Sequence, residues 1–268
     1  MRVYYVLSLL CAGSLVLSSC GDSGTGPTNL AESTRVADFL PSHNSLRSKL
    51  RQVLEEENGG LGFEMWATIL DRNGRVVDVV FSGQNRGDQW PGSRVISAQK
   101  ANTANAFSLE NFALSTANLY AAVQPGGSLF GLQESNPVDP DVAYKGPASA
   151  FGTANDPMIG GRIGGINVFG GGLALYSPSG KLLGGVGVSG DTACTDHIIA
   201  WKLRHRLNLD NVPGGVADNN ADDNIIFDED DPPNLTGFEH PKCFDVAPGD
   251  HVQIAEDLPT TNPIGAGE

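Results

Sequence analysis

Basic side chains are scarce in this sequence. Its 268 residues contain 17 Lys and Arg against 31 Asp and Glu, a formal net charge of −14. Fourteen of the acidic residues lie from Asp210 onward, where Lys242 is the single Lys or Arg, so the preceding part is near neutral. Binding of nucleic-acid phosphates needs clustered basic side chains. The composition therefore excludes nucleic acid as a partner.

Long hydrophobic runs are missing beyond the N-terminus. Residues 3–17 are apolar and follow one positive charge, Arg2, but the run is shorter than the ~20 residues of a spanning helix. It ends in Leu17-Ser18-Ser19-Cys20, which resembles a lipobox, the motif whose cysteine carries a lipid. We therefore interpret residues 1–20 as a lipoprotein signal peptide with Cys20 as the lipidation site. The alternative is an ordinary signal peptide with an incidental cysteine.

An exported protein anchored in this way works outside the cytoplasm. Position 21 is Gly, and Asp follows only at position 22, which favours the outer membrane over retention in the inner one. The protein is then lipid-anchored and faces the periplasm or the cell surface. Residues 21–43 are rich in Gly, Ser, Thr and Pro and predict a flexible tether. The alternative is an ordered arm that packs through Val36, Phe39 and Leu40.

Cysteine is rare as well. Cys11 and Cys20 belong to the N-terminal segment, which leaves Cys194 and Cys243 in the body. An even pair in an oxidising compartment predicts a disulfide that pins the acidic extension, residues 210–268, to the body. The competing interpretation, two metal ligands, has no supporting Cys/His spacing, so no metal site is assigned.

The body alternates between helical and strand patterns. Apolar periodicity predicts helices, β-rich runs predict strands, and the turn at Asp71-Arg72-Asn73-Gly74 predicts a hairpin. Hairpins separated by helices indicate an α+β domain with an antiparallel sheet. The predicted helices are 45–57, 93–107, 108–122 and 192–209; the predicted strands are 65–71, 76–81, 165–170, 173–177 and 182–189; 125–163 is loop-rich.

Two glycine-rich stretches imitate nucleotide-binding motifs. Residues 185–190 (GVGVSG) match G-x-G-x-x-G, but no second parallel strand ends in the acidic residue that a dinucleotide fold requires. No Lys-Ser or Lys-Thr closes the run 161–172 into a phosphate loop. The surroundings of Ser189 also miss the G-x-S-x-G elbow of serine hydrolases. The sequence indicates none of these three chemistries.

Three ordered segments resemble one known family, the GlcG/HbpS-like proteins. Residues 171–197 (GGLALYSPSGKLLGGVGVSGDTACTDH) are similar to the C-terminal signature of that family. Residues 65–83 resemble its opening hairpin, and 97–107 (SAQKANTANAF) its Lys-Ala-x-Thr-Ala helix. The likeness covers 45–123 and 165–209 within a domain of residues 44–209. The insertion 125–165, the extension after 209, and Ala174 in place of a usual Pro depart from the pattern.

The resemblance implies a profilin-like fold, with an antiparallel sheet of about five strands flanked by helices. It also implies a domain that commonly forms homo-oligomers. Several members bind haem, some are linked to haem degradation, and others accompany glycolate or cobalamin chemistry. Haem is thus the expected cofactor, and a small molecule is the expected ligand.

By the same resemblance the ligand lies near the Lys-Ala-x-Thr-Ala helix and the Gly-Val-Ser-Gly turn. Lys100, Thr103 and Phe107 share one helical face at i, i+3 and i+7. Asp191 or Thr192 opens the following helix, either as a plain cap or, with neighbouring N–H groups, as an anion site. For Lys100 the alternative is a solvated side chain. The predicted ligand-binding residues are Lys100, Thr103, Phe107, Ser189, Gly190 and Asp191.

Haem iron takes His, Cys, Met or Tyr as an axial ligand. The sequence lacks Cys-x-x-Cys-His, so covalent attachment is excluded. His197, His205 and His240 are the axial candidates, although a histidine near tryptophan on a helix is more often packed and hydrogen-bonded. Residues 218–231 (DNNADDNIIFDEDD) could hold calcium, but they lack the EF-hand order and read better as a solvated acidic loop.

Three functional interpretations remain open. The first is a tethered binding module that captures haem or a related small molecule. The second is a haem-degrading enzyme, although no acid–base pair or metal cluster in the sequence demands chemistry, so no catalytic residue is assigned. The third is a structural or assembly lipoprotein without a ligand.

Overall fold

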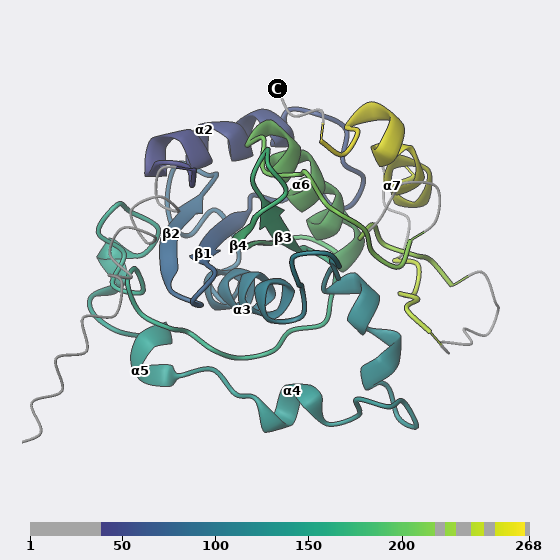
Figure 1. Cartoon of the computed structure of the whole chain (residues 1–268). Helices are drawn as coiled ribbons and strands as arrows, with labels where there is room; N and C mark the ends of the chain where they lie inside the picture. The colour runs from purple at the N-terminus through teal and green to yellow at the C-terminus, as the bar shows by residue number, and fades with distance from the viewer. Residues whose placement is uncertain (1–38, 218–222, 229–236, 244–249, 266–268) are drawn as a thin grey trace, which may run out of the picture.

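The computed structural model describes residues 39–217, 223–228, 237–243 and 250–265. Four strands form one antiparallel sheet in the order β2-β1-β4-β3 (Figure 1). β1 (Trp66–Asp71) and β2 (Val76–Phe81) form the first hairpin, and β3 (Gly172–Tyr176) and β4 (Leu182–Ser189) form the second. β1 also pairs antiparallel with β4, with Trp66 opposite Ser189. The antiparallel α+β fold is confirmed.

Three long helices cover the sheet. α3 (Ser93–Ala106) packs on one face, and α2 (His43–Leu54) and α6 (Ala193–Arg206) lie on the other (Figure 1). α7 (His251–Thr261) packs beside α6. The short helices are α4 (Leu132–Ser135), α5 (Pro140–Ala143) and three 3₁₀ turns, η1 (Ala117–Leu119), η2 (Ala121–Val123) and η3 (Ala148–Ala150). No helix in the described ranges is both long and apolar enough to span a bilayer.

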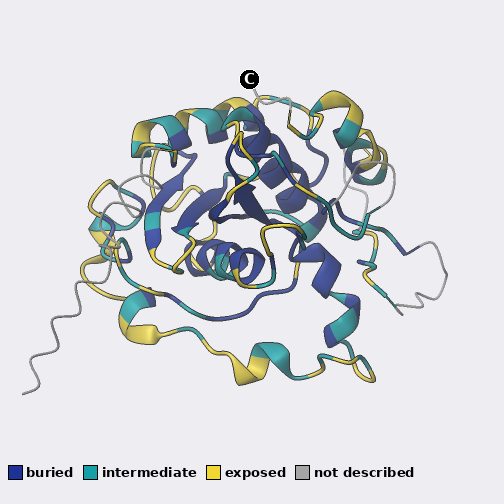
Figure 2. Ribbon diagram, in the orientation of Figure 1, coloured by how far each residue is buried: buried dark blue, intermediate teal, exposed yellow. Residues whose placement is uncertain are grey.

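The side chains of β1 point alternately to the two faces of the sheet and contribute to the hydrophobic core on each face. Ala67 and Ile69 join the cluster under α2 and α6, whereas Trp66 and Leu70 join the cluster on the α3 side. Successive strand residues point to opposite faces, so one short strand serves two layers. The sheet and the inward faces of its helices are accordingly buried (Figure 2).

Glycines let α3 approach the sheet closely. A Cβ on Gly187 would lie 1.9 Å from the Ser97 carbonyl oxygen, and one on Gly185 would lie 2.3 Å from that of Ala101. Glycine inside a strand marks such a close backbone approach. The G-x-G-x-x-G pattern is therefore explained by helix packing.

Several expectations need correction. The sheet has four strands where about five were expected, because 165–170 forms no strand. Residues 108–116 are irregular, and only the turns η1 and η2 follow within the predicted second helix. α2 begins at His43 and Leu40 is buried, so the end of the predicted tether packs on the body. Residues 1–38, with the lipobox, and most of 218–231 lie outside the described residues.

The insertion is part of the folded body. Within it, Asp156 accepts hydrogen bonds from Arg94 of α3, whose Nε lies 2.9 Å from Oδ2, and both side chains are buried. Met158 and Ile163 are fully buried in the cluster under α3. The insertion therefore completes the core on the outer side of α3.

Candidate functional site

Lys100 points inward from α3 and pairs with Asp196 of α6. Its Nζ lies 2.6 Å from Asp196 Oδ2, and both side chains are almost wholly buried. Burial raises the pKa of Asp196 to about 6, although Lys100 acts in the opposite direction. The solvated alternative for Lys100 is thus wrong. The ion pair ties α3 to α6 past the end of β4.

The backbone N–H groups of the Gly-Val-Ser-Gly turn are also engaged by the protein itself. Gly190 N and Asp191 N donate to Asp196 Oδ1 at 3.1 and 2.9 Å. The Asp191 carboxylate accepts from the amides of Leu61 and Phe63, while Thr192 caps α6 by accepting from Thr195 N. Asp196 therefore fills the place where the sequence suggested a bound anion. Ser189, which pairs with Trp66, lies at the end of β4 and is buried.

Thr103 and Phe107 lie farther along α3. Thr103 Oγ1 donates to the Gln99 carbonyl and accepts from Asn167 N at 2.9 Å. Phe107, the C-cap residue, packs partly buried against an apolar cluster beside α3. Its members are Leu119, Val123, Ile166 and Val168, with Leu114, Leu129 and Leu132 at the edge. The predicted helical face thus divides into a polar end at Lys100 and an apolar end at Phe107.

His197 is fully buried in the middle of the molecule. Its Nε2 lies 3.0 Å from Asn224 Oδ1 and 3.1 Å from Ile225 N. Burial lowers its pKa to about 3, so the ring is neutral. Nδ1 has no hydrogen-bond partner among the described residues. Through the hydrogen bonds at Nε2, His197 of α6 holds segment 223–228 of the extension in place.

His205 lies elsewhere. It is eight residues beyond His197, about 12 Å along the helix axis, and its Nδ1 contacts Asp210 Oδ2 at 2.8 Å. Both side chains are buried. His205 is therefore separated from the cluster around Lys100.

His240 lies in the short segment 237–243, whose backbone pairs with 226–228. Its ring contacts Tyr120 with centroids 4.8 Å apart, and Tyr120 in turn contacts Phe169. His240 Nδ1 lies 2.7 Å from the Pro241 carbonyl oxygen, whereas Nε2 is buried with no hydrogen-bond partner in the described part of the chain. Burial lowers its pKa to about 4. Lys100 affects the pKa of both His197 and His240, so these groups share one neighbourhood.

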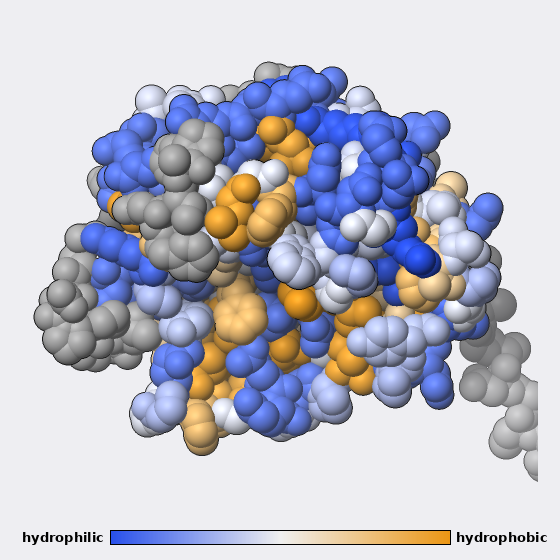
Figure 3. Space-filling model, turned by 180° about the vertical axis from the view of Figure 1, so that it is seen from behind, coloured by the Kyte–Doolittle hydropathy of each residue, from blue (hydrophilic) through white to orange (hydrophobic). Residues whose placement is uncertain are grey.

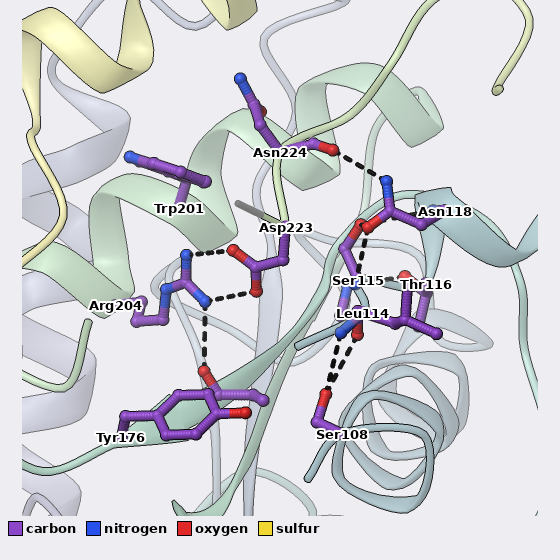
Figure 4. Close-up of polar contacts among 12 residues, drawn as sticks. Ser108, Leu114, Ser115, Thr116, Asn118, Tyr176, Trp201, Arg204, Asp223 and Asn224 are labelled. Atoms are coloured by element: carbon purple, nitrogen blue, oxygen red, sulfur yellow. Dashed lines mark hydrogen bonds and ion pairs between the residues drawn. The ribbon is translucent and has the colours of Figure 1, made fainter. Parts of the chain in front are cut away.

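Polar side chains of α6 and η1 anchor the extension to the body. Arg204 Nη1 and Nη2 contact the two Asp223 carboxylate oxygens at 2.6 and 2.8 Å, and neither side chain is exposed (Figure 4). Asn118 Nδ2 donates to the Asn224 carbonyl, and Nη1 of Arg204 donates to Ala174 O. Asp223 was not predicted from the sequence, because it stands in an acidic run that resembles a solvated loop.

The predicted disulfide between Cys194 and Cys243 is present, with Cα atoms 6.1 Å apart. It fixes segment 237–243 to the first turn of α6. His251 lies close to both sulfur atoms, and these three form the single group of potential metal ligands within the described ranges. The sulfur atoms are bonded to each other, so they offer no thiolate to a metal.

Tyr120 and Asp196 were not predicted as site residues from the sequence either. Tyr120 falls in a stretch predicted as a regular helix, and no periodic pattern distinguished it. Asp196 follows the capping residues by a few positions, and its partner Lys100 lies 96 residues earlier. Only the tertiary fold brings these groups together.

The chain was compared with known families and solved structures. Residues 44–203 match the family model described as "Haem degrading protein HbpS-like". No curated protein is significantly similar to the chain.

Similar solved structures include a PduOC:heme complex, with 24% identity and a TM-score of 0.42 over 62% of this chain and 92% of that one. Protein ORFY of Klebsiella pneumoniae has 22% identity and a TM-score of 0.38, covering 74% and 95%. HbpS has 17% identity and a TM-score of 0.38, covering 61% and 86%. The family match spans more than half of the sequence and includes both hairpins, α3 and most of α6. The chain belongs to the HbpS-like family.

Proposed function

We propose that this protein binds haem without a covalent bond, as a binding module held at a membrane by a lipid. The match of residues 44–203 to a family described by haem carries the proposal. The residues along α3 suit such a ligand in kind, because buried imidazoles and aromatic rings lie near Lys100 and an apolar cluster lies around Phe107. The unpartnered, buried Nε2 of His240 is the feature that a bound iron would explain.

An apolar macrocycle also needs apolar surface. Viewed from behind, hydrophobic side chains gather over the lower half of the molecule, the half that holds α3 in Figure 1 (Figure 3). Phe130 and Phe169 are among the exposed large hydrophobic residues. Patches of this kind on a folded protein mark binding or assembly surfaces. Both haem capture and the expected homo-oligomer would use them.

Titration of haemin into the chain from residue 21 onward tests the proposal. A saturable shift of the Soret band at one haemin per chain is the expected result. Absence of any spectral change beyond that of haemin alone would overturn it and favour a structural role. Adding a reductant and oxygen to the loaded protein tests the alternative of haem degradation, for which the band should decay with product release. A stable band supports binding without degradation.

The anchor is proposed from the lipobox and agrees with a disulfide, since disulfides persist in oxidising compartments. In cells, the Cys20→Ser variant should move from the membrane fraction to the soluble exported fraction. A matched Cys11→Ser variant should stay in the membrane fraction, because that cysteine precedes the lipobox. Equal fractionation of the two variants would contradict lipidation at Cys20.

A further inference from the structure

Of the three candidate histidines, only His240 has a ring nitrogen that is both unpartnered among the described residues and placed to ligate iron. His205 is engaged by Asp210, and His197 uses its Nε2 with Asn224 and Ile225. The nitrogen that His197 leaves without a partner is Nδ1, which adjoins the ring carbon bearing Cβ. A large planar ligand at that atom would collide with α6 itself.

His240 presents the opposite arrangement. A carbonyl oxygen only accepts hydrogen bonds, so the contact between Nδ1 and Pro241 O places the ring proton on Nδ1. In the neutral ring, Nε2 then carries a free lone pair, at the tip of the side chain. A histidine that donates one N–H to a backbone carbonyl and offers the other nitrogen is the usual form of a metal ligand.

Burial of His240 Nε2 without a hydrogen-bond partner among the described residues also destabilises the folded protein. His240 is 3% exposed, and its Nε2 has no partner among the described residues. Most buried polar atoms are paired, and an exception calls for a ligand or another explanation. Beside it, the partly buried Tyr120 ring connects to Phe169, which is 41% exposed. These rings form an aromatic path from the surface to His240.

We propose that His240, supplied by the extension and not by the family domain, is the axial ligand of the bound haem iron. The inference rests on the proposed function. It adds that the extension completes the site by supplying the iron ligand. Residues 204–268 lie outside the family match, so the ligand would be a feature of this chain. Tyr120 and Phe169 would line the macrocycle beside His240, and Lys100 is paired with Asp196.

The disulfide positions this ligand. Cys243 follows His240 by three residues and bonds to Cys194 at the start of α6. Residues 223–228 have their own anchors at Arg204, Asn118 and His197, so loss of the disulfide leaves them in place. Without the disulfide, segment 237–243 would still have its pairing with 226–228, the ring contact between His240 and Tyr120, and the contact between Cys243 N and His251.

Haemin titrations of four proteins test the inference, each made as the chain from residue 21, which keeps every described residue. His240→Ala should weaken binding at least about tenfold and change the absorption and electron paramagnetic resonance signature of the iron, because even outer-shell changes cost 10- to 100-fold in metal affinity. Free imidazole should restore the wild-type spectrum. His205→Gln should keep that spectrum, because His205 contacts Asp210 and is separated from this cluster. Cys194→Ser/Cys243→Ser should weaken binding by less than His240→Ala.

Circular dichroism and mass measurement of the Cys194–Cys243 bond should show that His240→Ala is folded with its segment attached. If the wild type binds haemin and folded His240→Ala gives the same spectrum, the assignment of His240 is overturned while haem binding stands. If wild-type protein binds no haemin, the proposed function itself fails. Unchanged binding in the double cysteine variant would overturn the positioning role of the disulfide.

Discussion

The interface between α3 and the sheet and the interface between α6 and the extension use opposite kinds of side chain. In the first, Gly185 and Gly187 remove side chains so that two backbones come close. In the second, the Arg204–Asp223 pair, the Asn118–Asn224 contact and a disulfide join the extension to the body, beside apolar residues such as Ile225 that enter the core. Close packing of α3 on the sheet thus depends on missing side chains, whereas the extension adds buried polar pairs and a disulfide to its apolar contacts.

This comparison predicts that damage to the extension's anchors will be concentrated at single residues. Asp223→Ala leaves the buried Arg204 guanidinium without its partner, and breaking a buried ion pair costs about 3–5 kcal/mol. Urea denaturation should show a loss of that size. The matched control is Glu56→Gln: Glu56 and Arg206 are partly exposed, and the buried Lys202 also donates to Glu57 O and Asn58 Oδ1, so the expected loss is about 0–1 kcal/mol. Similar losses in both variants would show that Asp223 is no anchor.

The disulfide gives the next largest effect. Cys194 and Cys243 are 49 positions apart, and closing a loop of that length stabilises the folded state by roughly 4 kcal/mol in the chain-entropy model, with typical values of about 2–4. Cys194→Ser/Cys243→Ser should therefore lower the free energy of unfolding by about 2–4 kcal/mol. Protease cleavage near residue 240 should rise while the family domain stays intact. Cleavage throughout the domain would contradict the separation of the two regions.

The packing of α3 can be broken by a single methyl group. In Gly187→Ala the new Cβ would meet the Ser97 carbonyl, and overpacking of this kind costs about 1–3 kcal/mol. Gly92→Ala is the matched control, because no heavy atom lies within 4 Å of its Cβ and its φ is −65°. Thermal unfolding should show a lower Tm for Gly187→Ala and almost no change for Gly92→Ala. Equal Tm values would mean that the helix can shift away from the sheet.

The two regions also differ in how much of their structure could be predicted from the sequence. Both hairpins, α2, α3 and α6 followed from local periodicity, turn residues and caps such as Thr192, which act within a few positions. The disulfide followed from counting cysteines. The pairs Lys100–Asp196 and Arg204–Asp223 did not follow, because each joins residues whose proximity depends on the finished fold.

The irregular segments show a second limit. Residues 165–170 have β-rich sequence, yet Gly165 has a positive φ and Asn167 N donates to the Thr103 side chain and not to a neighbouring strand. The alanines of 108–122 favoured a helix. Instead Ser108 and Ser115 bind nearby backbone or side-chain groups, which competes with helical pairing.

The smallest predicted effect is on the pH dependence of stability, and it concerns two buried histidines, His197 of the family domain and His240 of the extension. Burial lowers the pKa of His197 to about 3 and that of His240 to about 4, whereas histidines in the unfolded chain titrate near ~6.5. Between these values the unfolded state binds more protons, so stability falls as the pH falls. From pH 6 to pH 5 each histidine should remove about 1 kcal/mol. Asp196 acts oppositely, because its raised pKa makes its contribution fade as the pH rises from ~4 to about 6.

Urea denaturation at several pH values can therefore separate the regions. His240→Gln should lessen the fall in stability between pH 6 and pH 5, because it removes one of the two histidines whose pKa is lowered by folding. Asp196→Asn should make that fall steeper, since its opposing contribution disappears. A slope that is unchanged in His240→Gln would mean that His240 is protonated without unfolding of the whole domain. Segment 237–243 would then open in acid while α6 and the sheet stay folded around His197.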